Sequence, residues 1–359
     1  MVSRHEARRR VVLSSSMPHD ERYDQGLRRL EAFGPECMNG FSNHGSMAIE
    51  ALANLGRSEC IDGYLQRYIP GLAPAGKEMP PISASEVDTS LGKAPFARWL
   101  ATFRRELDRA PLEEVVRVWT PKLIPGCAAA AFHGPLMALH ALRALESGHT
   151  EPRLEAFARG LAYWAATYLP LPGSPSHSQD GVPLHELIAT IPVADGPKPG
   201  AIDAAIVHRT KDNAEFAQLV SRPRAIESDG IAVLTEAGAR ALLAYPGGTV
   251  IFTHTVTGPA AFRALSRWLD PGAMETAIDY LWRATAAILA TFSGPEPLPT
   301  SVEALSSPVD AAALVRSAIG TGDEHAIKLV EAALGEYATT DRSVCLQAAQ
   351  VATRQLGAD

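Results

Sequence analysis

The stretch TGDEHAIKLVEAAL, residues 321–334, decides how this 359-residue chain is interpreted. Gly322-Asp323 is typical of a helix start, because an Asp side chain can accept hydrogen bonds from the free amides of the first turn. The Ala- and Leu-rich residues that follow favour a continuing helix. His325 and Lys328 are three residues apart, so they share the face that carries the apolar residues. The stretch therefore predicts a helix that turns a His and a Lys towards the core.

A lysine that faces the core is costly, because burying an unpartnered ammonium takes several kcal/mol. Such a lysine is usually paired, deprotonated or chemically modified. The alternative is that Lys328 lies at the edge of the core and extends its amine to water, beside a hydrogen-bonded His325. Both interpretations stay open on this stretch alone.

Composition and charge describe a globular chain. Hydrophobic residues make up 46% and charged residues 20% of it, and no apolar run approaches the roughly 20 residues of a membrane span. The formal charge of −7 argues against a nucleic-acid surface, which needs clustered Lys and Arg. The basic triplet at residues 8–10 precedes an apolar run too short for a signal peptide. We therefore expect a cytoplasmic protein whose segment 1–38 is loosely structured, apart from a short helix at 21–32.

Helical patterns dominate the rest of the chain. We expect a single all-α domain at residues 39–359, a large helical bundle with little or no β-structure. Pro/Gly-rich loops or lids are predicted at 72–95 and 171–200. The four cysteines are widely scattered and form no CxxC pair, so neither structural zinc nor a disulfide framework is expected.

Two segments have ambiguous patterns. The β-branched run at 249–259 would be a strand on propensity alone. Because it stands alone, we interpret it as a short extended or helix-entry segment that leads into a helix at 260–269. A long helix is expected after Pro125-Gly126, and Pro135 should kink or restart it just after His133.

Four of the eleven histidines share a local setting, beside a turn or at a helix entry and flanked by small or apolar residues. They are His44, His133, His254 and His325. Any one such residue is more often a hydrogen-bonded structural histidine. Together they could meet at the centre of a helix bundle, where iron, zinc, copper and nickel all accept imidazole. His140 and His185 are the alternative candidates.

Other catalytic signatures are missing from the sequence. It contains no GxGxxG, P-loop, GxSxG or HExxH motif, so nicotinamide, nucleotide, serine-hydrolase and zincin chemistries have no support. Glu113-Glu114 and Asp323-Glu324 are interpreted as solvated helix starts.

In their order and spacing, several segments resemble the questin oxidase-like family. The resemblance extends from about residue 39 to the C-terminus, and no single motif decides it. Its motifs are Asn43-His44 before a helical run, Phe132-His133-Gly134, THTVT at 253–257, WRA at 282–284, DEHAIK at 323–328 and QAA at 347–349.

This resemblance implies a largely helical oxygenase that uses molecular oxygen to cleave a ring of an aromatic polyketide or an anthraquinone-like substrate. Some members are described as NADPH-dependent Baeyer–Villiger-type oxidases and others as mononuclear non-haem iron dioxygenases. For the iron-dependent members, the family pattern is a set of histidines with a lysine that carbon dioxide can carboxylate. Carried over to this chain, the ligands of Fe(II) would be His44, His133, His254 and His325, with Lys328 as the carboxylated residue.

Asn43 is then a candidate for fixing the second nitrogen of a ligating ring. The chain is shorter than the fungal members, and Pro135 directly after His133-Gly134 departs from their pattern. A metal-dependent hydrolase with a carbamylated lysine is a second candidate, although an HxH motif and a βα barrel are not visible. A non-catalytic helical binding protein is the third. No nucleic-acid or membrane partner is expected, and the sequence does not indicate the oligomeric state.

Overall fold

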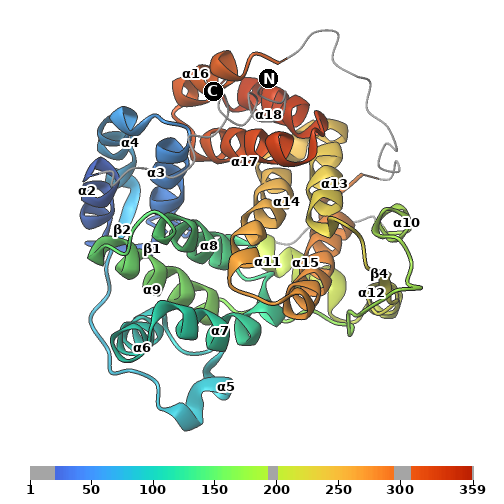
Figure 1. The fold of residues 1–359 in the computed structure, drawn as a ribbon, viewed down its shortest axis with the longest axis horizontal. Helices are drawn as coiled ribbons and strands as arrows, with labels where there is room; N and C mark the ends of the chain where they lie inside the picture. The colour runs from blue at the N-terminus through green and yellow to red at the C-terminus, as the bar shows by residue number, and fades with distance from the viewer. Residues whose placement is uncertain (1–20, 193–200, 295–308, 358–359) are drawn as a thin grey trace, which may run out of the picture.

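The computed structural model describes residues 21–192, 201–294 and 309–357, and these residues are mostly helical (Figure 1). The prediction of an all-α fold is confirmed. The first half of the chain contains α2 (Glu21–Leu30), α3 (Gly45–Asn54), α4 (Ile61–Tyr68), α5 (Val87–Ser90), α6 (Phe96–Arg109), α7 (Leu112–Leu123), α8 (His133–Leu145) and α9 (Glu151–Ala166). The second half contains α10 (Leu184–Ala189), α11 (Ile202–Thr210), α12 (Ala214–Val220), α13 (Gly230–Ala244), α14 (Thr249–Ala261), α15 (Pro271–Phe292), α16 (Ala311–Thr321), α17 (Glu324–Thr340) and α18 (Val344–Leu356).

The β-structure is limited to two small sheets. Strand β1 (Phe33–Cys37) pairs antiparallel with β2 (Leu72–Pro74), and β3 (His177–Ser178) pairs parallel with β4 (Arg224–Ala225). Short 3₁₀ helices make several of the connections, namely η1 (Ser58–Cys60), η2 (Ile69–Gly71), η3 (Ala84–Glu86), η4 (Ile124–Gly126), η5 (Pro246–Gly248) and η6 (Phe262–Arg267).

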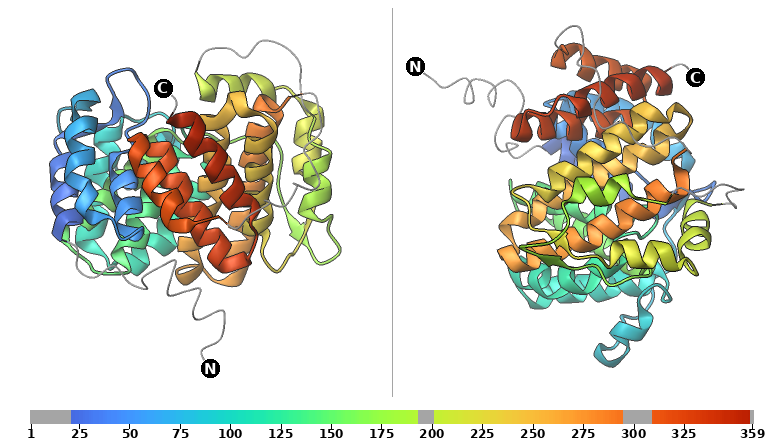
Figure 2. Two further views of the ribbon diagram at one scale, coloured as in Figure 1. Left: turned by 90° about the horizontal axis from the view of Figure 1, so that it is seen from above. Right: turned by 90° about the vertical axis from the view of Figure 1, so that its right-hand side faces the viewer.

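Four helices form the centre of the molecule. Helix α17 packs on α3, α3 on α8, α8 on α14, and α14 on α17, so that together they surround one point (Figure 1). Helix α9 covers the outer side of α8 and α6 packs on α9, while α13 and α18 cover α14 and α17. Seen from above, α17 and α18 lie between the N-terminal helices and α13–α15 (Figure 2).

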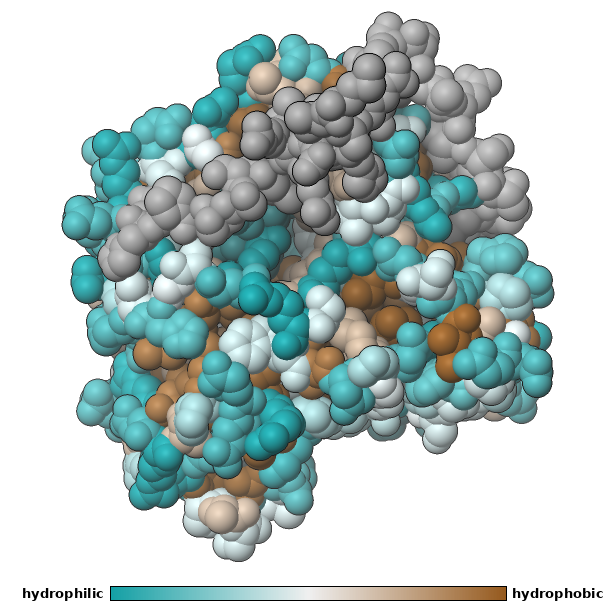
Figure 3. Space-filling model, in the orientation of Figure 1, coloured by the Kyte–Doolittle hydropathy of each residue, from teal (hydrophilic) through white to brown (hydrophobic). Residues whose placement is uncertain are grey.

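The packing of α8 against α9 shows how small residues bring helices close together. A side chain at Gly160 of α9 would place its Cβ only 2.4 Å from the Cα of Ala138 in α8. A glycine is therefore required where the two backbones meet. On the face drawn in Figure 3, hydrophobic residues are exposed in small areas between hydrophilic ones. No helix in the described part of the chain has the length and apolar character needed to cross a bilayer.

Three expectations about local structure are wrong. The short helix expected at 21–32 is observed as α2, but the residues after it, up to 38, are not loosely structured, because β1 follows; residues 1–20 lie outside the described part. The run at 249–259 is neither strand nor extended, but helix α14. The segment after Pro125-Gly126 does not continue as a helix, which begins only at His133. Pro135 stands in the first turn of that helix, so it does not kink or restart a longer one.

Candidate metal centre

All five residues predicted from the sequence meet at the centre of the four helices. His44 immediately precedes α3, His133 begins α8, and His325 lies in the first turn of α17. Three helices thus direct their N-terminal ends to one point, and α14 brings His254 to it from its middle. The ligand atoms of the four histidines all lie within 4.8 Å of one another. Lys328 follows His325 by one turn and is completely buried.

Helix α14 forms despite its β-branched residues because residues 252–259 are all buried. It packs against α8, α13, α15, α17 and α18, so its apolar residues have partners all round the helix. Its threonines return their hydroxyls to the helix backbone: Thr253 donates to Thr249 O at 2.9 Å and Thr257 to Thr253 O at 3.0 Å. Tertiary packing therefore overrides the local strand preference.

The loop before α8 is strained. Ala130, Ala131 and Phe132 have φ values of 47°, 52° and 72°, although none of them is glycine. The left-handed conformation costs roughly 1–2 kcal/mol for each such residue. Strain of this kind concentrates at functional sites, where the surrounding structure maintains it. Here it sets the position of His133, because the carbonyl of Ala130 contacts the Nδ1 atom of that ring.

Two backbone carbonyls fix the tautomers of two rings. His44 Nδ1 lies 2.7 Å from Ser42 O, and His133 Nδ1 makes the corresponding contact with Ala130 O. A carbonyl can only accept, so both Nδ1 atoms carry the proton and both Nε2 atoms keep a free lone pair. These two Nε2 atoms are 2.7 Å apart. Two lone pairs this close repel each other, and a shared cation removes the repulsion.

The rings are also held in the neutral form that metal ligation requires. Burial, together with Lys328, lowers the pKa of His133 to about 3. Burial likewise lowers the pKa of His44, helped by Lys328 and the neighbouring rings, and the pKa of His254, helped by His133 and Lys328. Neutral imidazoles in contact at neutral pH are suited to bind a metal dication.

At this site, two side chains have polar groups that no described residue partners. Neither ring nitrogen of His254 makes a hydrogen bond, and neither does the Nζ atom of Lys328. Burial lowers the pKa of Lys328 to about 7, against the opposing effect of Glu324 and Asp323. Buried polar atoms in native proteins nearly always have a partner, so these exceptions need an explanation. A bound ion would provide one for His254. The interpretation of Lys328 as a residue at the core's edge is wrong.

The sequence did not indicate several of the supporting groups. Glu324, expected to be solvated, places Oε1 3.9 Å from His44 Nδ1 and 3.8 Å from His325 Nδ1. The Tyr68 hydroxyl accepts a hydrogen bond from the backbone N–H of His44 at 2.6 Å. Asn43 does not orient a ring: its side chain bonds Gly34 O and Gly45 N instead. Asp323 caps α17 as predicted, and its Oδ1 also lies 3.3 Å from His325 Nδ1.

The alternative histidines lie elsewhere. His140 donates from Nδ1 to Glu50 Oε2 at 2.7 Å, and Arg143 joins the same carboxylate. Arg143 also reaches Glu331, 3.0 Å away. His185 is exposed on α10. Neither belongs to the cluster of four. The four cysteines are all free, as the sequence predicts.

No known family model matches this sequence, and no curated protein shows significant similarity to it. The geometry itself therefore carries the functional argument. It provides four buried imidazoles of which at least two present Nε2, a lysine with a depressed pKa and a carboxylate at the rim. This donor set fits a single transition-metal ion. Two ligands about 2.1 Å from one ion are separated by roughly 3 Å, close to the observed 2.7 Å.

Proposed function

We propose that this protein is an oxygenase that uses one non-haem iron ion, held by His44, His133, His254 and His325, to cleave a ring of an aromatic substrate oxidatively. The observation that carries the metal site is the 2.7 Å approach of the two unprotonated Nε2 atoms of His44 and His133. Imidazole ligands suit iron as well as zinc, copper and nickel. The choice of iron, and of an anthraquinone or related polyketide as substrate, rests on the resemblance of the sequence motifs.

Lys328 is proposed to be carboxylated by carbon dioxide. An amine whose pKa is about 7 is half neutral at pH 7, and only a neutral amine has the lone pair that attacks carbon dioxide. A bond forms between Nζ and carbon, one C–O double bond becomes a carboxylate, and the nitrogen releases its proton. Glu324, one turn earlier at the rim, is placed to accept that proton. The product is an anionic oxygen donor where the protein otherwise buries an unpartnered amine.

The chain's own residues would prepare the reaction in three ways. The carbonyls of Ser42 and Ala130 keep the rings of His44 and His133 in the ligating tautomer. Burial excludes bulk water from the centre. The N-terminal ends of α3, α8 and α17 add positive potential, which favours a bound carboxylate-like group. An iron ion bound there would supply one-electron and oxygen chemistry.

Metal analysis tests the proposal. Protein purified without added metal is expected to contain about one equivalent of iron per chain and to lose it in His133→Ala and His254→Ala. Oxygen uptake with a hydroxyanthraquinone, measured with and without NADPH, separates a dioxygenase from a Baeyer–Villiger-type oxidase. Stoichiometric iron that survives both substitutions contradicts the proposal.

A metal-dependent hydrolase is a second candidate, and the buried Lys328 favours it as much as it favours the oxygenase. The four histidines provide one metal position, and the second possible ligand group, Asp323, Glu324 and His325, shares His325 with it. Ester or amide hydrolysis without oxygen consumption, supported by zinc, would assign the protein to this class.

A further inference from the structure

His133 lies close to His44 against a repulsion. Without a shared cation, the two Nε2 lone pairs repel each other, because they are only 2.7 Å apart. The backbone N–H of His44 is fixed by the Tyr68 hydroxyl, and its ring is fixed by Ser42 O. His133 directly follows a turn, so a turn that relaxed would let its ring move away. Something other than a bound ion must therefore keep this turn in place.

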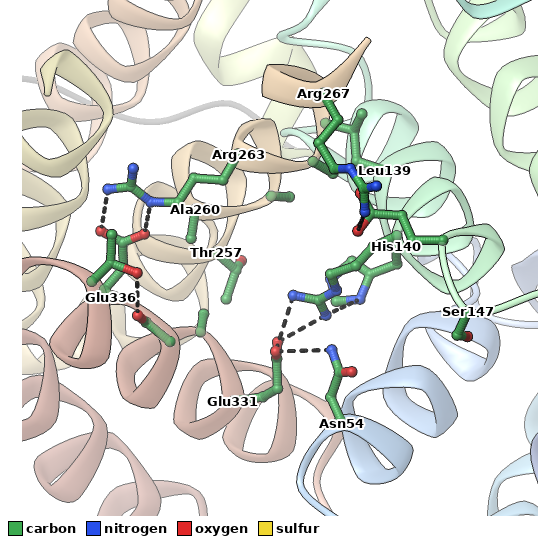
Figure 4. Close-up of a pocket in the computed structure, with 17 residues that line it drawn as sticks. Asn54, Leu139, His140, Ser147, Thr257, Ala260, Arg263, Arg267, Glu331 and Glu336 are labelled. Atoms are coloured by element: carbon green, nitrogen blue, oxygen red, sulfur yellow. Dashed lines mark hydrogen bonds and ion pairs between the residues drawn. The ribbon is translucent and has the colours of Figure 1, made fainter. Parts of the chain in front are cut away.

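The helices that carry the histidines are tied together at some distance from the metal centre. Glu331 of α17 accepts hydrogen bonds from Asn54 of α3 at 3.2 Å and from Arg143 of α8 at 3.1 Å, in the wall of a cavity of about 390 Å³ (Figure 4). These contacts lie roughly two to three helical turns beyond the histidines. They fix the bodies of the helices but not the turn that precedes α8.

The ring of Phe132 holds this turn from one side. It is completely buried and lies on Gly258 of α14, four residues after His254. A Cβ added at Gly258 would lie 2.9, 3.0 and 3.2 Å from three atoms of the ring. The ring thus fills the space that the glycine leaves, on the helix face that also carries His254. Its packing maintains the φ of 72° at Phe132, which is otherwise unfavourable.

Asp203 holds the same turn from a second side. It lies in the first turn of α11, and its half-buried carboxylate accepts a hydrogen bond from the backbone N–H of Ala131. Ala131 has a φ of 52°, and its N–H also bonds Ala128 O at 3.0 Å. The carboxylate therefore stabilises the left-handed conformation at the centre of the turn.

Arg283 fixes the start of the segment that leads to His133. This buried arginine of the WRA motif donates from Nη2 to Pro125 O at 2.7 Å. From Nη1 it donates to Leu171 O at 2.6 Å and to Gly173 O at 3.0 Å. The segment is thus anchored before the turn as well as after it, and only the turn itself is left to relax.

We propose that Asp203 and Phe132 are positioning residues of the metal centre: they hold the strained turn at 130–132 and so keep His133 in its ligating position before an ion binds. The turn also supplies Ala130 O, which fixes the ring's tautomer. A ring that is already in place loses less freedom on binding, so the ion is bound more tightly. This effect on metal binding rests on the proposed function, whereas the position of the ring does not depend on it.

Two substitutions release the turn, and each has a matched control. Asp203→Ala removes the acceptor, whereas the amide oxygen of Asp203→Asn can still accept from Ala131. Gly258→Ala adds a Cβ that displaces the ring of Phe132. It does not weaken α14 by itself, because alanine is the better helix former. Gly335→Ala on α17 is its control, since a Cβ there meets no atom within 4 Å.

Crystal structures of the full chain, stripped of metal by a chelator, measure the position of the ring. Asp203→Ala and Gly258→Ala are expected to move His133 Nε2 away from His44 by about 1 Å or more, enough to spoil a ligand site. Asp203→Asn and Gly335→Ala should leave it in place. A ring that stays in place overturns the role of the residue concerned, and an equal shift in Asp203→Asn overturns the role of the hydrogen bond to Ala131.

Titration of the same proteins with Co²⁺ measures the consequence. The visible absorption of bound Co²⁺ depends on the number and geometry of its ligands, so it separates a displaced ligand from a merely less stable protein. Asp203→Ala and Gly258→Ala should weaken binding by about 10- to 100-fold and change the spectrum, and both controls should match the wild-type chain. Wild-type affinity and spectrum in both released variants overturn the inference.

Thermal melting checks that each variant is folded. If the wild-type chain takes up neither Co²⁺ nor iron, the metal centre itself is wrong. The crystal structures still decide whether Asp203 and Phe132 hold the turn, so failure of one proposal is distinguishable from failure of the other.

Discussion

Two buried polar clusters are built on the same helices and differ in how their atoms are satisfied. Around Glu50, every charge has a partner: His140 and Arg143 bind its carboxylate, and Arg143 also binds Glu331. Around His254, one or two turns away, ring nitrogens and the amine of Lys328 have none among the described residues. A satisfied network stabilises a fold, whereas an unsatisfied one of this size costs free energy. The cluster around Glu50 therefore needs no ligand, whereas a bound ion would supply partners that the cluster around His254 lacks.

The largest expected effect is the loss of metal when one ring is removed. His254→Ala should lower bound iron from about one equivalent to less than one tenth, because the substitution removes a ligand from a four-imidazole site. The metal-free protein should also lose some stability, because removing this buried ring leaves a cavity. Metal analysis and thermal melting of the chelated protein measure both quantities. His185→Ala, at an exposed histidine, is the control and should keep its iron.

The satisfied cluster should respond in the opposite way. Glu50→Ala leaves Arg143 and His140 without their shared carboxylate in the core, and breaking such a buried pair costs about 3–5 kcal/mol. Urea denaturation of the metal-free protein measures the loss. The fraction that remains folded should still bind iron with unchanged stoichiometry. Glu59→Ala, at an exposed carboxylate, should be neutral; equal destabilisation by both substitutions would refute the structural role of Glu50.

The two clusters should also differ in how they respond to pH. If Lys328 must take up carbon dioxide, its carboxylation releases two protons below its pKa of about 7, where it starts from the ammonium form. Above that pKa it starts from the neutral amine and releases one proton. At constant dissolved carbon dioxide, lowering the pH by one unit should thus weaken the apparent iron affinity about tenfold above pH 7 and about a hundredfold below it. The pKa of His133, about 3, adds no proton in this range.

Glu50 behaves differently because its pKa is lowered to about 2 by Arg143 and His140, despite its burial. A lowered carboxylate pKa contributes stability that is complete above about 4.5 and is lost as the pH falls towards 2. Metal binding should therefore fail near pH 6 while the fold persists. An iron affinity that does not change between pH 6 and 8 would contradict the role given to Lys328.

A change in stability smaller than that of Glu50→Ala, and of opposite sign, is expected at Lys328. Lys328→Met should stabilise the metal-free protein by roughly 2 kcal/mol, because it removes an unpartnered buried amine, and should abolish iron binding. Lys328→Arg should not restore the metal, since a guanidinium stays charged and cannot form a carbamate. A destabilised Lys328→Met protein that retains its iron would indicate that the lysine serves only the fold.

The sequence predicted the members of the candidate site better than their surroundings. His44, His133 and His325 could be found because each stands at a helix start, where the chain itself marks the position with turns and caps. Helix α14 was missed because its β-branched residues form a helix only when neighbours bury them, as they bury residues 252–259. The cluster around Glu50 was missed too: Arg143 lies 93 residues from Glu50 and 188 from Glu331 in the chain, and no local pattern connects them.

Anomalous diffraction from crystals of the untreated protein, recorded above and below the iron absorption edge, tests the central claim most directly. A single iron peak is expected within bonding distance of His44, His133, His254 and His325, with density for a carboxyl group on Lys328. An anomalous map without a peak at this point, in crystals whose four histidines hydrogen-bond only to one another, would contradict the metal centre.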